Sequence, residues 1–495
     1  MRRRLFSILG LSGVLLLPLG MGCDGSSGSS SGTGGGGAAG AGGQSPTGGD
    51  GGAGGQTGTG TGGGATGPGG AGGGGGGGGA PVPAWDWTGI VGTGQSLAVG
   101  DQGRPVRGTE QRFDNLKLSL GNTSVPPFDP ASAALSLVPL VEPIRPFATT
   151  YPSAYPNNIQ GETPHTAMAD QISTLAQAAG GEHVSVHTEV GESGQGIEAL
   201  RKGATEVVQG ATSVGRAYAA TLFEVEAIAR LAREADKTYG VGAIVVTHGE
   251  HDAGRPTYED DLFKLWSDYN QDLKALTGQT RSIPMLVSQQ HSVPFEAGSR
   301  SASTYAQWHV GVEHPGDIVC SGPKYQYPYA DDHVHLNANG YELLGEKYGQ
   351  IVFEKVVLGR DWQPLQPTDV ERSGRVITVR FHVPVGPLKW DDALPSPHQT
   401  AYTEWAQGRG FEVWSGTSRI TISGVEIDGD AVRITVAADL PASGVMVGYA
   451  ATSDGAMMNG GTTRWGQLRD SDPFVGSRSG VAQPNYCVAF ELSVP

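Results

Sequence analysis

From residue 87 onwards, apolar runs of strand length alternate with segments in which apolar residues recur at helical spacing. The run at 87–93 ends in glycines, and the run at 243–246 is rich in branched residues, as expected of buried strands. Further strands are expected at residues 183–190, 284–288 and 317–320, and helices from 163 onwards and at about 215–238, 258–276, 303–312 and 338–357. Because strands that alternate with helices form parallel sheets, residues 81–365 are predicted to be a doubly wound α/β domain.

Two stretches do not follow this alternation. Residues 101–160 are rich in proline and contain few periodic segments, which indicates an insertion or a wrapping loop. Beyond about residue 366, apolar residues alternate singly with polar ones, as at 376–383 and 431–436, and Asp/Gly turns separate several of these segments. Residues 366–495 are therefore predicted to form an all-β accessory domain that resembles a β-sandwich.

The first 80 residues carry targeting features instead of a fold. Three arginines precede an apolar run at 5–19, which is shorter than the about 20 residues of a membrane span. Cys23 follows, so residues 1–23 resemble a bacterial lipoprotein signal with Cys23 as the lipidation site; ordinary signal-peptidase cleavage is the alternative. Residues 24–80 are mostly glycine and are expected to be a disordered tether, because they have almost no apolar area to bury. We expect an exported protein, periplasmic or on the outer surface, whose only membrane attachment is a lipid anchor.

Charge and cysteine content narrow the class of protein. The chain carries 33 Lys and Arg against 49 Asp and Glu, a formal net charge of −16 at pH 7. An acidic chain without a basic stripe repels phosphate backbones, which argues against nucleic-acid binding. If Cys23 is lipidated, Cys320 and Cys487 remain, and their spacing does not decide between a disulfide and two thiols.

Most polar clusters follow directly on predicted strands, at the edge where open α/β sheets bind ligands. Ser96 lies in a glycine-flanked turn after the first strand, and His335 follows Asp332 by three residues in a loop before a helix. A serine hydroxyl near neutral pH needs a base within hydrogen-bonding reach, and the base needs an orienting group. Ser96, His335 and Asp332 offer these three parts, with Asp331 as the alternative to Asp332.

Four short blocks follow one another along the chain: Gly94-Gln95-Ser96-Leu97, Ser193-Gly194, Gly249-Glu250-His251-Asp252 and Asp332-His333-Val334-His335. In content and order they resemble the four blocks of the SGNH (GDSL-type) hydrolases. The Gly-Gln-Ser opening and the His-Gly-Glu-His-Asp segment are most similar to the sialate O-acetylesterase and acetylxylan esterase branch. The resemblance covers residues 86–358 and implies a three-layer, flavodoxin-like fold with a parallel sheet.

The resemblance implies a catalytic role for three of these residues. Ser96 would attack an ester carbonyl, His335 would act as general base and then as acid, and Asp332 would hold the imidazole tautomer. The backbone amides of Ser96 and Gly194 would form part of the oxyanion hole.

The third block departs from the family pattern, because the usual side-chain amide of the oxyanion hole is replaced. Either His248 or His251 would then supply the side-chain donor, since a neutral imidazole can donate a hydrogen bond. Glu250 matches the family's glutamate and, with Gln95, would support the site from behind.

Several of these residues have other interpretations. Glu192 and Asp252 are interpreted as structural. The cluster His248, Glu250, His251 and Asp252 lies in a turn without a Cys pair, unlike helical zinc motifs, so neither a metal nor another cofactor is expected. Four tryptophans of the C-terminal region could stack on sugar rings or fill the β core: Trp390, Trp405, Trp414 and Trp465.

The features together favour a serine esterase that removes O-acetyl groups from a carbohydrate, with an acetylated glycan as its partner. The same residues could instead cleave lipid, aryl or polyester esters. A non-catalytic surface glycan-binding protein is the alternative of another class, and the intact set of Ser96, Asp332 and His335 argues against it. The sequence does not indicate an oligomeric state.

Overall fold

The computed structural model describes residues 82–495 except 124, 150–152, 205–206, 210–211 and 215. The expected signal, the lipidation site at Cys23 and the tether lie outside the described residues. The described residues belong to one compact unit. Across the described ranges, no helix combines the length and the apolar character that a membrane span requires.

A seven-stranded sheet forms the centre of the N-terminal part. Its order is β3-β2-β4-β1-β7-β8-β9, and every neighbouring pair is parallel except β2 and β3. The strands are β1 (Trp87–Gly94), β2 (Leu116–Ser119), β3 (Ser136–Pro139), β4 (Ser185–Gly191), β7 (Tyr239–Thr247), β8 (Met285–Gln289) and β9 (Ile318–Pro323). The predicted flavodoxin-like parallel sheet is thereby confirmed.

Strands β2 and β3, the last two strands on one side of the sheet, lie in the stretch 101–160, which the sequence indicated to be an insertion or a wrapping loop. That interpretation missed them because each strand has only four residues, too few for an alternating pattern to stand out. The rest of this stretch is irregular and returns to the sheet at α1 (Pro164–Ala178), where Thr163 is the N-cap.

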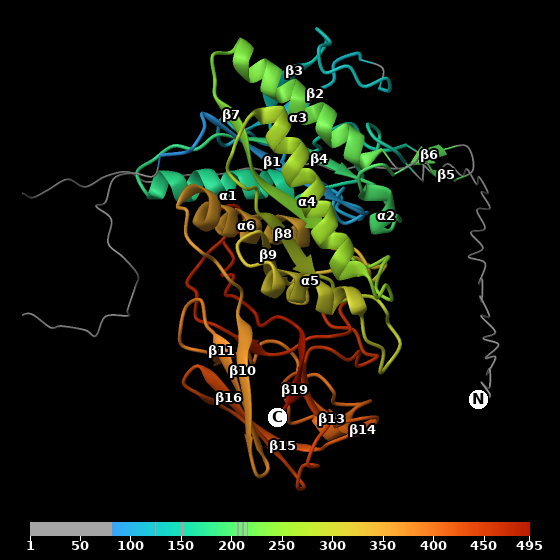
Figure 1. Cartoon of the computed structure of the whole chain (residues 1–495), viewed down its shortest axis with the longest axis vertical. Coiled ribbons are helices and arrows are strands. Elements are labelled where there is room, and N and C mark those ends of the chain that lie inside the picture. Colours follow the sequence, from blue (N-terminus) through green and yellow to red (C-terminus); the bar gives the residue numbers. More distant parts are fainter. Residues whose placement is uncertain (1–81, 124, 150–152, 205–206, 210–211, 215) are drawn as a thin grey trace, which may run out of the picture. The chain divides into compact units, whose positions relative to one another are not determined.

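Helices cover both faces of the sheet (Figure 1). Because successive side chains of a strand point to opposite faces, Ile90 packs in one core and Val91 in the other. The Ile90 face meets α1 and α6 (Ala338–Val352), and the Val91 face meets α3 (Ala217–Glu234) and α4 (Tyr258–Thr277). The other helical segments are α2 (Ile197–Leu200), α5 (Ala302–Glu313), the π-helix Phe353–Val357 and the short 3-10 helix Thr403–Trp405.

Residues 366–495 form antiparallel sheets, as predicted (Figure 1). Two four-stranded sheets, β10-β11-β16-β15 and β14-β13-β17-β19, share one apolar core, and β12 pairs with β18. The strands are β10 (Gln366–Ser373), β11 (Val376–His382), β12 (Lys389–Trp390), β13 (Phe411–Ser415), β14 (Ser418–Arg419), β15 (Ile422–Asp428), β16 (Ala431–Val436), β17 (Val445–Tyr449), β18 (Leu468–Arg469) and β19 (Phe490–Val494). A separate short hairpin joins β5 (Val207–Gln209) to β6 (Thr212–Val214).

The C-terminal region packs directly on the α/β part. The Gln289 side chain at the end of β8 pairs with the backbone of Ala489, donating to its carbonyl at 2.9 Å and accepting from its amide at 2.8 Å. Trp308 and Tyr325 of the α/β part belong to the same apolar core as the β-sheets. The two regions therefore share buried surface instead of being joined only by a linker.

The tryptophans of the C-terminal region serve mainly as core residues. Trp405, Trp414 and Trp465 are buried, so they do not present open faces to a sugar ring. Trp390 is partly exposed, and the guanidinium of Arg409 lies 5.2 Å from its ring centre.

Candidate active site

Ser96 lies in a tight turn at the carboxyl end of β1. Gly94 has a φ of 150°, and a Cβ there would collide with the carbonyl oxygen of Thr247 at the end of β7. Glycine thus lets β1 and β7 end side by side, and the Gln95 amide donates to that same carbonyl at 3.2 Å. Irregular turns follow, in which the Asp101 amide donates to the Ser96 carbonyl at 2.9 Å. No regular helix follows Ser96 directly.

The structure brings Ser96, His335 and Asp332 into one hydrogen-bonded chain. His335 Nε2 lies 2.6 Å from Ser96 Oγ, and His335 Nδ1 lies 2.5 Å from Asp332 Oδ2. The other oxygen of Asp332 accepts from the backbone amides of Val334 and His335, both at 3.0 Å. The carboxylate is therefore fixed by its own loop while it orients the imidazole. Asp331 is exposed and has no hydrogen bond within the described part of the chain, so it is not the orienting group.

Neighbouring carboxylates raise the pKa of the His335 imidazole. Burial lowers the pKa of His335, but the hydrogen bond to Asp332 and the charges of Asp101, Asp332 and Glu250 outweigh it, and the pKa is raised. Burial also raises the pKa of Asp332, yet its hydrogen bonds from His335 and Val334 hold that pKa at about 2. Asp332 is thus ionised at every pH at which His335 can serve as a base.

Two backbone amides, those of Ser96 and Gly194, are available as donors. In the described residues, neither the amide of Ser96 nor that of Gly194 donates a hydrogen bond. Gly194 adopts a φ of 72° in the turn after β4, a left-handed conformation that glycine takes without strain. Unpaired amides beside a nucleophile are the arrangement that binds an oxyanion.

The two candidate histidines of the third block have different environments. The ring of His248 is fully buried, with Nδ1 2.8 Å from the Tyr258 hydroxyl and Nε2 3.1 Å from the Gln195 carbonyl. Both ring nitrogens have partners within the protein, so His248 is not free to donate a hydrogen bond to a substrate. The geometry therefore disfavours His248 as the side-chain donor of the oxyanion hole. His251 is exposed, its ring lies against Gly196 beside the Gly194 turn, and its amide donates to Gln95 Oε1 at 3.3 Å.

Glu250 lies behind the site in a buried ion pair. Its Oε1 is 2.7 Å from Lys324 Nζ, with side-chain exposures of 3% and 0%. Its Oε2 has no hydrogen-bond partner among the described residues. Glu250 therefore depends on Lys324 for compensation of its charge.

We expect Lys324→Met to lower the free energy of unfolding by about 3–5 kcal/mol, because it leaves the buried Glu250 carboxylate without its counter-ion. Urea denaturation followed by fluorescence measures this change. Lys202→Met is the matched control, since Lys202 forms an exposed pair with Asp272 at 2.8 Å and its removal should change stability little. Equal stabilities of the two variants would contradict the prediction.

Sequence analysis missed two polar residues beside the nucleophile. Asp101 Oδ2 lies 3.8 Å from His335 Nε2. The side-chain amide of Gln160 is oriented so that both of its polar atoms have hydrogen-bond partners. Its nitrogen donates to the Asp101 carboxylate, at 2.8 and 3.1 Å, and its oxygen accepts from the Ser193 hydroxyl. The only signal for Asp101 was its place five residues after Ser96, and Gln160 reaches the site through an irregular loop that carries no pattern.

Glu192 and Asp252, two acidic residues in or next to the blocks, accept hydrogen bonds from backbone amides. Glu192 Oε1 accepts from the amides of Arg216 and Ala217 at the start of α3, at 2.5 and 2.8 Å. Asp252 Oδ2 accepts from the Ile197 amide at 2.7 Å. Both contacts agree with a structural interpretation. Among the described residues, no group of three or more His, Cys, Asp or Glu is placed to hold a metal ion.

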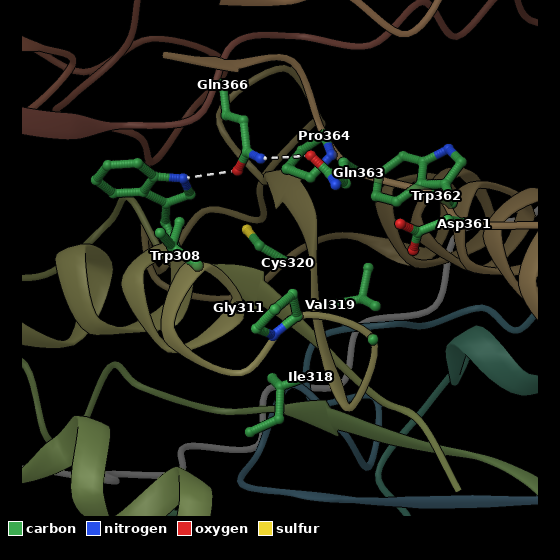
Figure 2. A pocket seen from close by; sticks show the side chains of 13 residues that line it. Trp308, Gly311, Ile318, Val319, Cys320, Asp361, Trp362, Gln363, Pro364 and Gln366 are labelled. Carbon is green, nitrogen blue, oxygen red and sulfur yellow. Dashed lines mark hydrogen bonds between the residues drawn. The ribbon is translucent and has the colours of Figure 1, made fainter. Parts of the chain in front are cut away.

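A cavity of about 180 Å³ lies apart from these residues, between α5, β9 and the segment that leads into β10. Figure 2 shows Cys320 on its wall, next to Trp308, whose indole donates to Gln366 Oε1 at 2.9 Å. Cys320 and Cys487 are both buried and both free, so they are two thiols and not a disulfide. Burial raises the pKa of Cys320 to about 12, which makes it a poor nucleophile.

Comparisons with known proteins give structural similarities only. Neither a protein-family model nor a curated protein sequence matches the chain. The chain is similar to the carbohydrate acetylesterase XAC1771 from Xanthomonas citri, with 12% identity over 82% of this chain and 80% of that one and a TM-score of 0.48.

Two smaller proteins are similar to part of the chain. For the carbohydrate acetylesterase Est24 from Sinorhizobium meliloti the identity is 12% over 55% of this chain and 99% of that one, with a TM-score of 0.29. For NanS the identity is 11% over 55% of this chain and 98% of that one, with a TM-score of 0.33. Two of these three proteins are carbohydrate acetylesterases, a class of enzyme that the sequence blocks resemble. At these identities the activity of this chain has to be argued from its own site.

Proposed function

We propose that this chain is a serine ester hydrolase that removes O-acetyl groups from a carbohydrate through an acyl-serine intermediate. The observation that carries the proposal is the chain of contacts from Ser96 Oγ through His335 to Asp332, at 2.6 and 2.5 Å. The amides of Ser96 and Gly194, which donate to no other described residue, add to it. Nucleophile, base, orienting group and oxyanion donors are the four parts that acyl transfer to a serine requires.

In the proposed reaction, His335 Nε2 takes the hydroxyl proton as Ser96 Oγ attacks the acetyl carbonyl carbon. The carbonyl oxygen becomes an oxyanion that the amides of Ser96 and Gly194 bind. The bond to the sugar oxygen then breaks, and His335 returns its proton to that oxygen. Water attacks acetyl-Ser96 with His335 again as base, and acetate leaves as Ser96 Oγ regains a proton.

The polar surroundings of Ser96 support a sugar alcohol over a lipid or aryl alcohol. Asp101 lies beside His335, Gln160 bonds to both Asp101 and Ser193, and the exposed His251 borders the Gly194 turn. These groups can hydrogen-bond to hydroxyls, whereas an acyl chain or an aromatic alcohol gains most from apolar walls. Export with a lipid anchor at Cys23 remains part of the proposal, because a tethered enzyme suits a polymer outside the cell.

The test is release of acetate by the purified full chain from acetylated xylan and a panel of other acetylated glycans, compared with hydrolysis of a medium-chain p-nitrophenyl ester. Acetate release that disappears in Ser96→Ala supports the proposal. Hydrolysis of the p-nitrophenyl ester without acetate release from any glycan would favour the lipid, aryl or polyester alternative. Glycan binding without any ester cleavage would favour a non-catalytic role.

We also propose that His251, and not His248, supplies the side-chain donor of the oxyanion hole. His251→Ala is expected to reduce kcat by about 10²–10³-fold with little change in stability. His248→Ala should instead lower the melting temperature, because the Tyr258 hydroxyl and the Gln195 carbonyl lose a buried partner. Near-normal turnover of His251→Ala would show that the backbone amides act without a side-chain donor.

A further inference from the structure

The loop that carries Asp332 and His335 is irregular and has limited support of its own. It is closed by a bridge between Tyr329 and Leu336 and by a hydrogen bond of 2.8 Å from the Ala330 amide to the His335 carbonyl. His333 adopts a φ of 65°, a left-handed conformation that a non-glycine residue keeps only when its surroundings hold it. The position of His335 thus depends on what contacts this loop from outside.

A turn of the C-terminal region makes these outside contacts. Met458–Thr462, hereafter the brace, is closed by a hydrogen bond of 2.8 Å from the Met458 amide to the Thr462 carbonyl. Within the brace, the Asn459 carbonyl accepts from the Tyr329 amide at 2.9 Å. The Asn459 side chain donates to the carbonyls of Tyr325 and Gln326, both at 3.2 Å. The brace therefore binds the backbone at three positions, Tyr325, Gln326 and Tyr329, which lie before and at the start of residues 329–336, hereafter the catalytic loop.

A second contact reaches the centre of the loop, between Asp332 and His335. His333 Nδ1 donates to the Gly460 carbonyl of the brace. The next residue, Gly461, lies so close that a Cβ would collide with the Tyr329 ring and press on the His333 carbonyl. The brace and the loop are therefore in direct contact at residue 461, where no side chain larger than that of glycine can be accommodated.

The two residues that follow the brace, Thr463 and Arg464, anchor it to residues 291–294, just after β8. The Thr463 amide donates to the His291 carbonyl at 3.0 Å. The buried Arg464 donates to the carbonyls of Val293 and Pro294, the latter at 2.9 Å. A movement of the brace relative to the sheet would break these contacts, so the brace can act as a fixed reference for the loop.

We propose that the brace is a positioning element of the candidate active site, in which Asn459 and the His333–Gly460 contact hold His335 at hydrogen-bonding distance from Ser96. The catalytic consequence rests on the proposed esterase function. Neither Asn459 nor Gly460 contacts Ser96 or the ring of His335, so they act through the loop and are not catalytic residues. The C-terminal region then completes the catalytic unit in addition to any role it has toward substrate.

The test compares Asn459→Gly, His333→Asn and the double variant in the full chain. Asn459→Gly keeps the backbone φ of 50° accessible while it deletes the side-chain donors, and asparagine at residue 333 tolerates the left-handed conformation. Each single variant should lower kcat about 10–100-fold with KM nearly unchanged, because a small displacement of a base is enough to slow proton transfer. The double variant should lose less than the product of the two, since both changes release the same loop.

Met457→Ala is the matched control, because Met457 is 43% exposed and lies two residues before Asn459. Hydrogen exchange is the second readout and needs no turnover: the amides of Tyr329 and His335 should exchange faster in Asn459→Gly while those of β1 and β7 stay protected. Normal kcat with unchanged exchange of the loop would overturn the proposal, and so would uniformly faster exchange with normal kcat per folded molecule. If the unaltered chain cleaves no ester, the proposed function fails, and the exchange result alone still decides on the brace.

Discussion

His335→Ala is expected to reduce kcat by roughly 10⁶-fold, to the same residual rate as Ser96→Ala. The two residues form one proton-transfer unit, with Nε2 and Oγ 2.6 Å apart, so that loss of either leaves the hydroxyl without activation. For the same reason, the double variant should be no slower than either single one. Residual rate above that in water would come from the amides of Ser96 and Gly194 and from substrate binding.

Release of the deacetylated alcohol under single-turnover conditions measures this effect, because the alcohol leaves in the acylation step, whereas acetate leaves only when acetyl-Ser96 is hydrolysed. His382→Ala is a suitable control, since His382 is a partly exposed residue of β11 in the C-terminal sheet. Circular dichroism confirms that each variant is folded. A His335→Ala variant that turns over within tenfold of the unaltered chain would exclude the assigned base.

The central fold was predictable because its strands are buried on both faces. Runs such as those of β1 and β7 contain no charged residue and are rich in apolar residues and glycine, and the helices between them repeat apolar residues at 3.6-residue spacing. The contact between Ser96 and His335, 239 residues apart, was only partly predictable from the strand pattern. Ser96 directly follows a predicted strand, at the edge where parallel strands place their carboxyl ends, but His335 lies well beyond the strand predicted at 317–320. The place of His335 beside Ser96 was therefore expected mainly from the resemblance of the four sequence blocks.

Other features depend on packing that no local pattern encodes. The burial of His248 follows from Tyr258 and Gln195, which approach it from other segments of the chain. The approach of Asp101 to His335 depends on the irregular turns after Ser96, which have no repeat to recognise. The contacts of Asn459 with the catalytic loop join residues more than 130 positions apart, between two regions that the sequence suggested were separate domains.

Asp332→Asn is expected to lower kcat by about 10⁴-fold, the second largest effect. The amide keeps the size of the carboxylate, but it cannot stabilise the imidazolium that forms when His335 takes the serine proton. It can also present its own N–H to Nδ1, which would favour the tautomer with the proton on Nε2 and block its action as a base. The fall in rate therefore reports the loss of the carboxylate charge and the wrong imidazole tautomer, and not a change in side-chain size.

The pH profile separates this explanation from a loss of folding. His335 must be neutral to act as a base, so activity should rise with pH through its pKa, which the carboxylates hold above the ordinary value against the effect of burial. Without the charge of Asp332, that pKa falls, and the acid limb of kcat/KM should move to lower pH even as the maximum declines. Asp331→Asn is the isosteric control. It should change neither the acid limb nor the maximum of kcat/KM, because Asp331 is exposed and is not part of the hydrogen-bonded set of Ser96, His335 and Asp332. An acid limb that stays in place in Asp332→Asn but moves in Asp331→Asn would transfer the orienting role to Asp331.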